Sequence, residues 1–477
     1  MTPYLSMSQG WTLVKRHGRQ YVTLANTSTG SLLIIIKTIR YFFTIPIMWT
    51  KNEPAVLCDK MSWLTNFLRD VFSPQCKGVN FKKIVEGRIR DAGLWHDRDA
   101  YGIHRIAKIS IVCFLSTNLT QIVALLLAKD DPKALFAGIS VLSFCMMGFL
   151  KLWSLLSNEK RWRSIINQAL SLENEQLNNY SPCDYESDDD EKHSFTKHID
   201  SYTRDIFLIS CNLTRIYSFT AVVYIVSPFL EYAIYMKTGR DISSMPHILP
   251  EWSPLDSYTV GYIVTILVEV VAALYCVKVH IAFDLTAVGL MIFIRGQFSC
   301  LHKYSELIGG QGKSSNLEEK RDKRAYYRII KCHSINVLLI NTVHELEILL
   351  RNILGIYFFV ATLTLCSVAV QLNEDQVSTT QLISLLQYMG ATLTQLFLFC
   401  RYGDAVLNEI SVGQGQGPFC SARWCLSPKV HQEIAILGAG MSRPYRLRAG
   451  PFNSLDLPSF IQIIRTAYSY YAFLRQT

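Results

Sequence analysis

The chain has 477 residues, of which 50% are hydrophobic and only 18% are charged. Soluble domains average about 25% charged residues, and the mean hydropathy of this chain is positive at +0.19. The formal net charge of +9 does not indicate binding to nucleic acid, because the basic residues are scattered between long apolar runs. Composition therefore argues against a soluble globular protein. It predicts a polytopic membrane protein whose basic residues set its orientation.

The N-terminal region carries an apolar run over residues 32–49 that Lys37 and Arg40 interrupt. No convincing cleavage site follows the run, so it is not a clean signal peptide. Three interpretations stay open: a helix on the membrane surface, a non-native extension, or a marginal membrane span. We favour the first two. The first true span must then act as its own anchor.

Three membrane spans are predicted in the next part of the chain. The first is the uncharged run Ile109–Ala128, and a short charged turn joins it to the second, Ala134–Leu150. Both have close to the ~20 residues that a helix needs to cross a bilayer. The polar region 151–204 follows as a loop. The third span lies within Ile206–Met236, where Pro228 should kink the helix.

The fourth and fifth spans are predicted to belong to helices that continue beyond the membrane. The stretch Tyr258–Ile294 is longer than a bilayer core requires at about 1.5 Å per residue. A helical pattern that begins near Arg328 runs into the fifth span, Asn352–Leu372. The sixth span, Thr379–Cys400, follows a short acidic turn.

Two patterns resemble metal sites, and neither is convincing. The acidic tract 184–191 lacks the glycine turn and the terminal glutamate of a calcium-binding EF-hand, so we expect a solvated loop. His280 and Asp284 are four residues apart, which places both on one helical face. A closed metal site usually needs four ligands. We therefore expect a hydrogen-bonded pair here, and no metal, cofactor or catalytic residue is predicted.

The last span occupies residues 457–477 and begins beside Pro458, which a first helical turn tolerates. Arg465 lies within this apolar stretch. An ionisable group at membrane depth usually faces the interior of a helix bundle or a water-filled path. The alternative is an arginine that extends toward the interface.

The distribution of basic residues predicts the orientation of the chain. Residues 151–204, 295–331 and 401–456 contain 22 Lys and Arg residues, whereas the alternate loops 129–133, 237–257 and 373–378 contain 4. Cytoplasmic loops carry an excess of Lys and Arg. The N-terminus is therefore expected in the cytoplasm, and seven spans place the C-terminus outside the cell.

The end of the chain carries two short patterns, Pro-Phe-Asn-Ser-Leu-Asp-Leu over 451–457 and Ala-Tyr-Ser-Tyr-Tyr over 467–471. Together with the lead-in 441–450 they resemble the final helix of insect odorant receptors. Gly93-Leu94-Trp95 is a partial match to the Gly-Leu-Trp-Pro that this family often has before its first span. The resemblance covers about residues 75–477. We therefore treat 75–477 as one all-α, seven-transmembrane domain and 1–74 as an N-terminal extension.

One segment departs from the family pattern. The family normally has a Tyr-x-x-x-Trp signature before the last span, whereas this chain has Cys420 in the position of the tyrosine and keeps Trp424. A glycine-rich run precedes it. The conformation of residues 411–427 is therefore not predicted.

The resemblance implies an odorant-binding tuning subunit of a ligand-gated cation channel, formed as a hetero-tetramer with the odorant-receptor co-receptor. It implies a multi-pass protein of the plasma membrane in sensory neuron dendrites, in contact with lipid and without nucleic acid. Cytoplasmic extensions of spans four to six would pack between subunits. The seventh helices would line one pore, with a narrow gate at Phe473, Gln476 and Thr477.

The resemblance also implies an odorant pocket in the outer half of the bundle. Aromatic walls with a few polar groups suit a small volatile ligand. The alternative for each of these residues is ordinary helix packing. By position, the lining is expected to include Phe144, Phe219, Tyr224, Tyr262, Ile266, Tyr388 and Thr392.

Two other functions stay open at this point. A gustatory receptor would share the architecture, but its family tends to end in Thr-Tyr followed by aliphatic residues and Gln-Phe. A secondary transporter often shows repeats and broken helices in matching halves, and the sequence has no such repeat. An enzyme is disfavoured because no nucleophile or phosphate-binding pattern is evident.

Overall fold

The computed structural model describes most of the chain from residue 81 onward and two short strands before it. The chain divides into two compact units, Met1–Lys60 and Met61–Thr477. The described residues are 11–16, 19–24, 81–95, 105–127, 132–178, 188–238, 246–249, 258–310, 318–373, 378–412, 416–421, 426–442, 445–451 and 453–476.

The first unit contains an antiparallel hairpin of β1 (Trp11–Arg16) and β2 (Arg19–Leu24). Its register pairs Trp11 with Leu24 and Arg16 with Arg19. The sequence did not predict this hairpin. The apolar run 32–49, interpreted above as a surface helix, an extension or a marginal span, lies outside the described residues.

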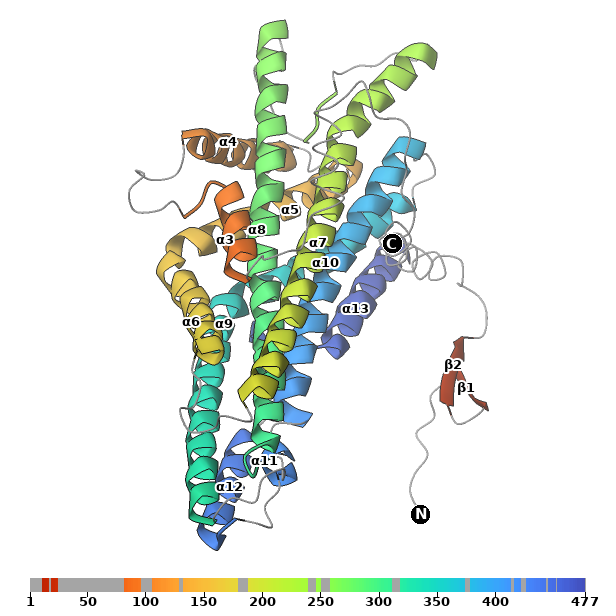
Figure 1. The fold of residues 1–477 in the computed structure, drawn as a ribbon. Helices are drawn as coiled ribbons and strands as arrows, with labels where there is room; N and C mark the ends of the chain where they lie inside the picture. Colours follow the sequence, from red (N-terminus) through yellow and green to blue (C-terminus); the bar gives the residue numbers. More distant parts are fainter. Residues whose placement is uncertain are drawn as a thin grey trace, which may run out of the picture. The chain divides into compact units, whose positions relative to one another are not determined.

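The second unit is helical, as predicted (Figure 1). Among the residues that the structure describes, six helices are long and apolar enough to cross a membrane, namely α4, α5, α7, α8, α9 and α10. The last helix, α13, has 20 residues, but it contains no membrane-length stretch as apolar as those in these six helices. The helices are α3 (Phe81–Asp91), α4 (Arg105–Leu127), α5 (Pro132–Ser157), α6 (Glu159–Asn178), α7 (Asp188–Thr238), α8 (Thr259–Glu306), α9 (Glu318–Leu372), α10 (Thr379–Val412), α11 (Gln416–Cys420), α12 (Pro428–Met441) and α13 (Leu457–Gln476).

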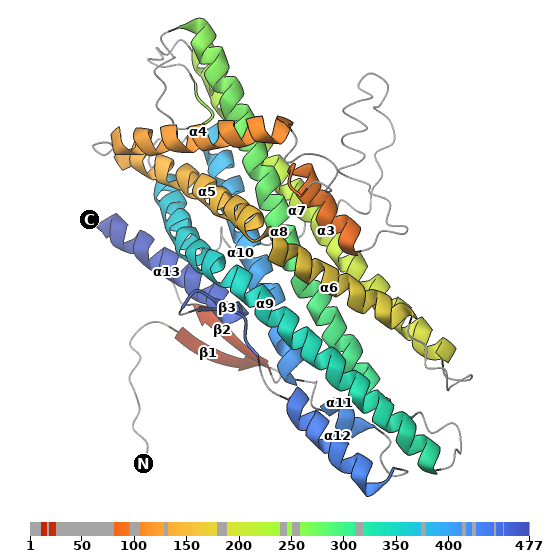
Figure 2. The same ribbon diagram turned by 90° about the vertical axis from the view of Figure 1, so that its left-hand side faces the viewer.

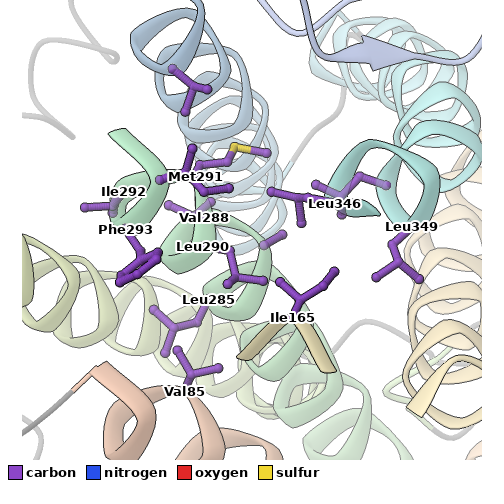
Figure 3. Close-up of a cluster of buried hydrophobic side chains, with 14 of the residues drawn as sticks. Val85, Ile165, Leu285, Val288, Leu290, Met291, Ile292, Phe293, Leu346 and Leu349 are labelled. Carbon is purple, nitrogen blue, oxygen red and sulfur yellow. The ribbon is translucent and has the colours of Figure 1, made fainter. Parts of the chain in front are cut away.

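Helix α8 is the centre of this unit. Every residue from Val279 to Ile294 is buried, which is the pattern of a helix that other elements surround on all sides. It contacts α3, α4, α5, α7, α9, α10 and α11. In both views α8 runs through the middle of the helices, with α4 crossing it (Figures 1 and 2). Figure 3 shows α8 residues such as Leu285 and Val288 packed among Val85 of α3, Ile165 of α6, and Leu346 and Leu349 of α9.

The helices that carry spans four and five are longer than a bilayer core requires, as predicted. Helix α8 has 48 residues and α9 has 55. Helix α9 begins at Glu318, ten residues before the predicted start. Helix α7 has 51 residues and is therefore also longer than the predicted third span. It passes through Pro228 without interruption. The kink at Pro228 stays a prediction.

The polar region 151–204 is not a loop, and this expectation was wrong. Its first residues continue α5, and α6 follows directly. Helix α6 buries side chains three or four residues apart, at Trp162, Ile165, Ile166, Ala169 and Leu172. Such spacing makes an amphipathic helix that packs one face against the bundle. The other face is polar, so the mean hydropathy of the segment is low and hides the helix. The acidic tract 184–191 is described only from Asp188, where α7 begins.

A short hairpin connects α12 to the last helix. Strands β3 (Arg448–Ala449) and β4 (Asn453–Ser454) pair antiparallel, and their turn lies against α9. The N–H of Gly450 donates to the carbonyl oxygen of Arg351 over 2.7 Å. A Cβ on Gly355 would lie 2.6 Å from the Cα of Gly450, so the close approach requires glycine in α9. Gly450 itself has φ of 69°, a conformation that favours glycine.

The hairpin leads into a capped start of α13. Asp456 accepts the backbone N–H of Ser459 over 2.9 Å and its hydroxyl over 2.7 Å. This geometry is an N-cap, in which a side-chain oxygen satisfies an amide of the first helical turn. Pro458 occupies the first turn, as predicted. The hairpin and the cap together fix where α13 begins relative to α9.

Candidate functional site

Four aromatic rings from four different helices meet inside the bundle, and we call them the aromatic cluster: Phe144 of α5, Tyr224 of α7, His280 of α8 and Tyr388 of α10. The Phe144 ring stacks on the His280 ring with centroids 4.3 Å apart. Tyr388 meets Phe144 edge-on at 6.1 Å and Tyr224 at 5.8 Å. Edge-on and stacked pairs at these distances are attractive. The cluster brings together three of the seven predicted ligand-binding residues.

Tyr388 is held by a hydrogen bond as well as by its ring contacts. Its hydroxyl donates to the backbone oxygen of Ser140 over 2.8 Å. Thr392, one turn further along α10, donates its hydroxyl to the backbone oxygen of Tyr388 over 3.0 Å. Tyr357 of α9 in turn donates to the carbonyl oxygen of Thr392 over 3.4 Å. A fourth predicted lining residue, Thr392, therefore lies one turn from the cluster.

A buried ion pair lies beside the aromatic cluster. The Nζ atom of Lys151 is 2.6 Å from Oδ1 of Asp284, and both side chains are almost completely buried. Lys151 also contacts Nδ1 of His280 over 2.9 Å. A protonated amine must donate, so Nδ1 accepts and the hydrogen on Nε2 is directed at the backbone oxygen of Phe144, 3.2 Å away. The ion pair thus orients the ring on which Phe144 stacks.

The second oxygen of Asp284 is satisfied from two further helices. Tyr217 of α7 donates its hydroxyl over 2.7 Å, and the Gln395 amide of α10 donates over 2.7 Å. The Lys151 ammonium also lies 5.7 Å from the centre of the Phe283 ring and 5.6 Å from that of Tyr357. A buried charge is tolerated where it is paired and fully hydrogen-bonded. We call this set (Lys151, Asp284, Tyr217, Gln395 and His280) the ion-pair network.

The ion-pair network changes the interpretation of His280 and Asp284. Both lie on one face of α8, as their spacing predicted, but each of them binds Lys151. Lys151 was placed in a polar loop, whereas it belongs to α5. The sequence does indicate that Lys151 belongs to a helix, because the apolar pattern of the second span continues past it through Leu152, Leu155 and Leu156. Tyr217 and Gln395 carry no such signal, because their role depends on tertiary contacts. Within the described residues no group of three or more His, Cys, Asp or Glu side chains is arranged to hold a metal.

The other predicted lining residues lie apart from the cluster. Tyr262 donates its hydroxyl to the backbone oxygen of Pro246 over 2.7 Å and packs on the His247 ring. It is 18 residues from His280 along α8, or roughly 27 Å. Ile266, one turn further along, is half-buried, and Phe219 is 57% exposed on α7. The structure therefore separates Tyr262, Ile266 and Phe219 from the aromatic cluster.

The predicted gate residues lie at the end of α13. Phe473 is 64% exposed. Gln476 is the last residue of α13, but its side chain and all of Thr477 lie outside the described residues. Arg465 is also exposed, so it does not face the interior of the helix bundle of its own chain. A water-filled path beside Arg465 stays a prediction.

The fold and sequence were compared with known proteins. The solved olfactory receptor OR5 of Machilis hrabei in complex with eugenol superposes with a TM-score of 0.66 at 16% identity, covering 83% of this chain and 97% of that one. The same receptor in a second structure gives a TM-score of 0.64, covering 87% of this chain and 99% of that one at 16% identity. These likenesses show the same fold.

Sequence comparison gives the family. Odorant receptor 13a of Drosophila melanogaster is 22% identical over 378 residues, which cover 76% of this chain and 82% of that receptor. Odorant receptor 82a of the same species is 23% identical over 383 residues, which cover 78% of this chain and 91% of that receptor. The family model described as 7tm Odorant receptor matches residues 131–468. The chain therefore belongs to the 7tm odorant receptor family and is an odorant-binding, multi-pass membrane receptor rather than an enzyme.

Proposed function

We propose that this receptor is the tuning subunit of a hetero-tetrameric, ligand-gated cation channel that it forms with the odorant-receptor co-receptor. It would act in the plasma membrane of sensory neuron dendrites. The observation that carries the proposal is the aromatic cluster, where rings from four membrane helices meet beside a buried ion pair. A molecule that separates these rings changes the packing of α5, α7, α8 and α10 at once.

The cluster suits a small, mostly apolar ligand with a polar group. Phe144, Tyr224 and Tyr388 offer ring faces and edges, and Thr392 lies one turn away. Ligand pockets of this kind are apolar with a few placed polar groups. The M. hrabei receptor was solved with the small molecule eugenol, which supports a ligand of similar size here. Tyr262 and Ile266 are proposed only as residues of an outer approach, because they lie away from the cluster. Phe219 is exposed and precedes Tyr224, toward the cytoplasmic end of α7 in the proposed orientation, so we do not propose it as a lining residue.

The proposed orientation places the cluster in the outer half of the membrane. Phe144 is 12 residues after the start of α5 and Tyr388 is 9 residues after the start of α10. Both starts follow loops that contain few basic residues, and such loops are expected outside the cell. A tag after Thr477 should therefore be labelled on intact cells, and a tag at residue 312 only after permeabilisation. The reverse labelling pattern would contradict the proposed orientation.

The channel function is tested by recording odorant-evoked current. Cells would express this receptor alone, the co-receptor alone, or both, and would be exposed to the same odorant panel. We expect odorant-specific cation current only from the pair. The proposal fails if the pair, with both chains present at the cell surface, passes no current to any odorant to which the native neurons respond.

A further inference from the structure

A small polar pocket lies between α3 and α6, away from the aromatic cluster. Its volume is about 200 Å³, and it is lined by Lys82, Glu86, Arg90, Trp95, Arg163 and Asn167. The two helices contact each other, and the ribbon views place both beside the middle of α8 (Figures 1 and 2). Nothing in the odorant-binding function uses this pocket.

The lining carries an excess of positive charge. Glu86 is its one carboxylate, and that carboxylate is shared between Lys82 at 3.5 Å and Arg90 at 3.4 Å. The third cation, Arg163, is paired through Nε with Glu159 of its own helix at 2.7 Å. A group with several anionic oxygens could accept hydrogen bonds from all three cations. Arginine suits phosphate in particular, because its planar group donates two parallel hydrogen bonds.

Trp95 forms a fixed wall of the pocket. Its φ of 55° is rare for a residue with a side chain, and such conformations persist only where the surroundings enforce them. The indole N–H donates to the backbone oxygen of Leu155 over 3.2 Å, which ties the residue to the end of α5. The Arg163 guanidinium lies 5.1 Å from the centre of the indole ring. Trp95 therefore positions Arg163 at the pocket.

The pocket adjoins the ends of two membrane helices, because Trp95 is hydrogen-bonded to Leu155 of α5 and precedes the start of α4 by ten positions. Helix α4 starts with the exposed apolar residues Ile106 and Ile109, and α5 ends shortly after the exposed Trp153. Exposed tryptophan is typical of the membrane interface. Both helix ends belong to the basic side of the chain, which the proposed orientation puts in the cytoplasm. The cytoplasmic leaflet is rich in anionic lipids, and basic pockets between helices on this side bind their headgroups.

We propose that the α3–α6 pocket binds the phosphate groups of an anionic phospholipid headgroup in the cytoplasmic leaflet. Lys82, Arg90 and Arg163 donate to the phosphate oxygens, and the exposed side chains at the ends of α4 and α5 face the acyl chains. The source of the lipid rests on the orientation proposed above, which the tag experiment tests independently of lipid binding. Binding would link the position of α3 and α6 to the composition of the membrane.

The test measures lipid binding to the full-length receptor in detergent by native mass spectrometry. The probes are dioctanoyl phosphatidylinositol bisphosphate, dioctanoyl phosphatidylcholine and free inositol trisphosphate. The variant Lys82→Gln/Arg90→Gln removes two lining charges. The matched control Lys160→Gln/Arg161→Gln removes two exposed charges from the neighbouring turn of α6 that do not line the pocket. Equal thermal midpoints of both variants and the wild type verify folding.

We expect the bisphosphate lipid to bind at least about tenfold more weakly to the pocket variant, because two charge-assisted contacts are lost. The control should change binding less than about threefold, and Arg163→Lys should give an intermediate loss. Equal losses in the pocket variant and the control would overturn the proposal, because binding would then follow overall charge. Equal affinity for the lipid and for inositol trisphosphate would also overturn it, since the site would then take a soluble anion.

Discussion

Lys151 shows how one residue organises the centre of this receptor. A lysine inside a membrane helix is costly unless its charge is compensated. Here its partner lies 133 positions later, on α8, and the carboxylate of that partner receives hydrogen bonds from α7 and α10 as well. One charge pair therefore ties four helices together at a single point, next to the rings proposed to bind odorant.

The first prediction compares the loss of one member of the Lys151–Asp284 ion pair with the loss of both. Asp284→Leu or Lys151→Met alone should lower the free energy of unfolding by about 3–5 kcal/mol, because each leaves a buried charge without its partner. The double variant should cost less than the two single variants together. Thermal unfolding in detergent, followed by the fraction of monodisperse receptor, measures this. Exposed Lys160→Met is the control. Strict additivity would show that the two side chains do not stabilise each other.

The second prediction concerns Tyr388. Tyr388→Ala should raise the odorant concentration for half-maximal response by roughly tenfold, because an aromatic wall contributes both contact area and ring pairing. Tyr388→Phe removes only the hydrogen bond to Ser140 and should have a smaller effect. Phe219→Ala is the matched control, since Phe219 is exposed. Responses are compared at equal surface expression. An unchanged odorant profile in Tyr388→Ala would assign Tyr388 to helix packing.

The third prediction is a pH dependence that comes from Glu173 on α6. This carboxyl is buried, and Tyr202 donates to one of its oxygens over 3.0 Å. Burial raises the pKa of Glu173, and the hydrogen bond from Tyr202 only partly opposes the effect. A raised pKa in the folded state favours the folded receptor at low pH, and this contribution is lost as pH rises through the folded pKa.

Glu173→Gln cannot ionise and should therefore be relatively more stable at high pH. We expect the melting temperature of the variant, minus that of the wild type, to be higher at about pH 8 than at about pH 4.5. The same detergent and ionic strength are used at both values. A difference that does not change with pH would show that Glu173 is not a source of pH dependence.

At the scale of elements, the sequence predicted the helices that consist of long apolar runs. The spans of α4, α5, α8, α9 and α10 were found because a lipid-facing or fully buried helix has a high mean hydropathy. Helix α6 was missed because only one of its faces is apolar. The β3–β4 hairpin was missed because its two-residue strands are held by contacts with α9, which is distant in sequence.

The candidate site likewise contains residues that the sequence could predict and contacts that it could not. The aromatic residues Phe144, Tyr224 and Tyr388 could be predicted, because family resemblance gives the region and the residue type gives the chemistry. The contacts of Asp284 with Tyr217 and Gln395 could not, because they depend on how α7, α8 and α10 pack. The exposure of Phe219 depends on helix rotation, which an apolar sequence with little periodicity does not reveal.

The fourth prediction tests the contact between Gly355 of α9 and Gly450 of the hairpin that precedes α13. Gly355→Ala adds a methyl group 2.6 Å from the Cα of Gly450, so the hairpin must move. Overpacking of this kind costs about 1–3 kcal/mol. Gly440→Ala is the matched control, because a Cβ there meets nothing within 4 Å and alanine favours the helix. The melting temperature should fall for Gly355→Ala and stay level or rise for Gly440→Ala. Equal behaviour would show that the hairpin does not need this close approach.

At the scale of the whole molecule, α13 differs from the other membrane helices. It packs against α9 and α10, yet Ile461, Tyr470 and Phe473 remain exposed, as does Arg465. A membrane helix that presents an arginine outward is poorly matched to lipid on that side. Its outward face suits a neighbouring subunit or a water-filled path, in line with the proposed channel.

The fifth prediction tests this face as a pore. Apolar constrictions can gate a channel by excluding water, so Phe473→Ser should raise the resting current when the receptor is expressed with the co-receptor. Gln476→Lys adds a positive charge to the same end of α13 and should lower cation conductance. Phe219→Ser is the matched control, because Phe219 is a similarly exposed phenylalanine on α7, which the proposal does not place at the pore, and it should leave resting current unchanged.

The size of these effects follows from the proposed assembly. If the co-receptor supplies most of the ring, each substitution alters only part of it, so the changes in current should be partial. Arg465→Gln should reduce the amount of assembled channel more than it changes ion selectivity, because Arg465 lies deeper along α13 than Phe473. Purified channels must first be shown to contain this subunit. If resting current, conductance and selectivity all stay at wild-type values in such channels, α13 of this chain does not line the pore, and its exposed face is a contact with lipid or with another subunit.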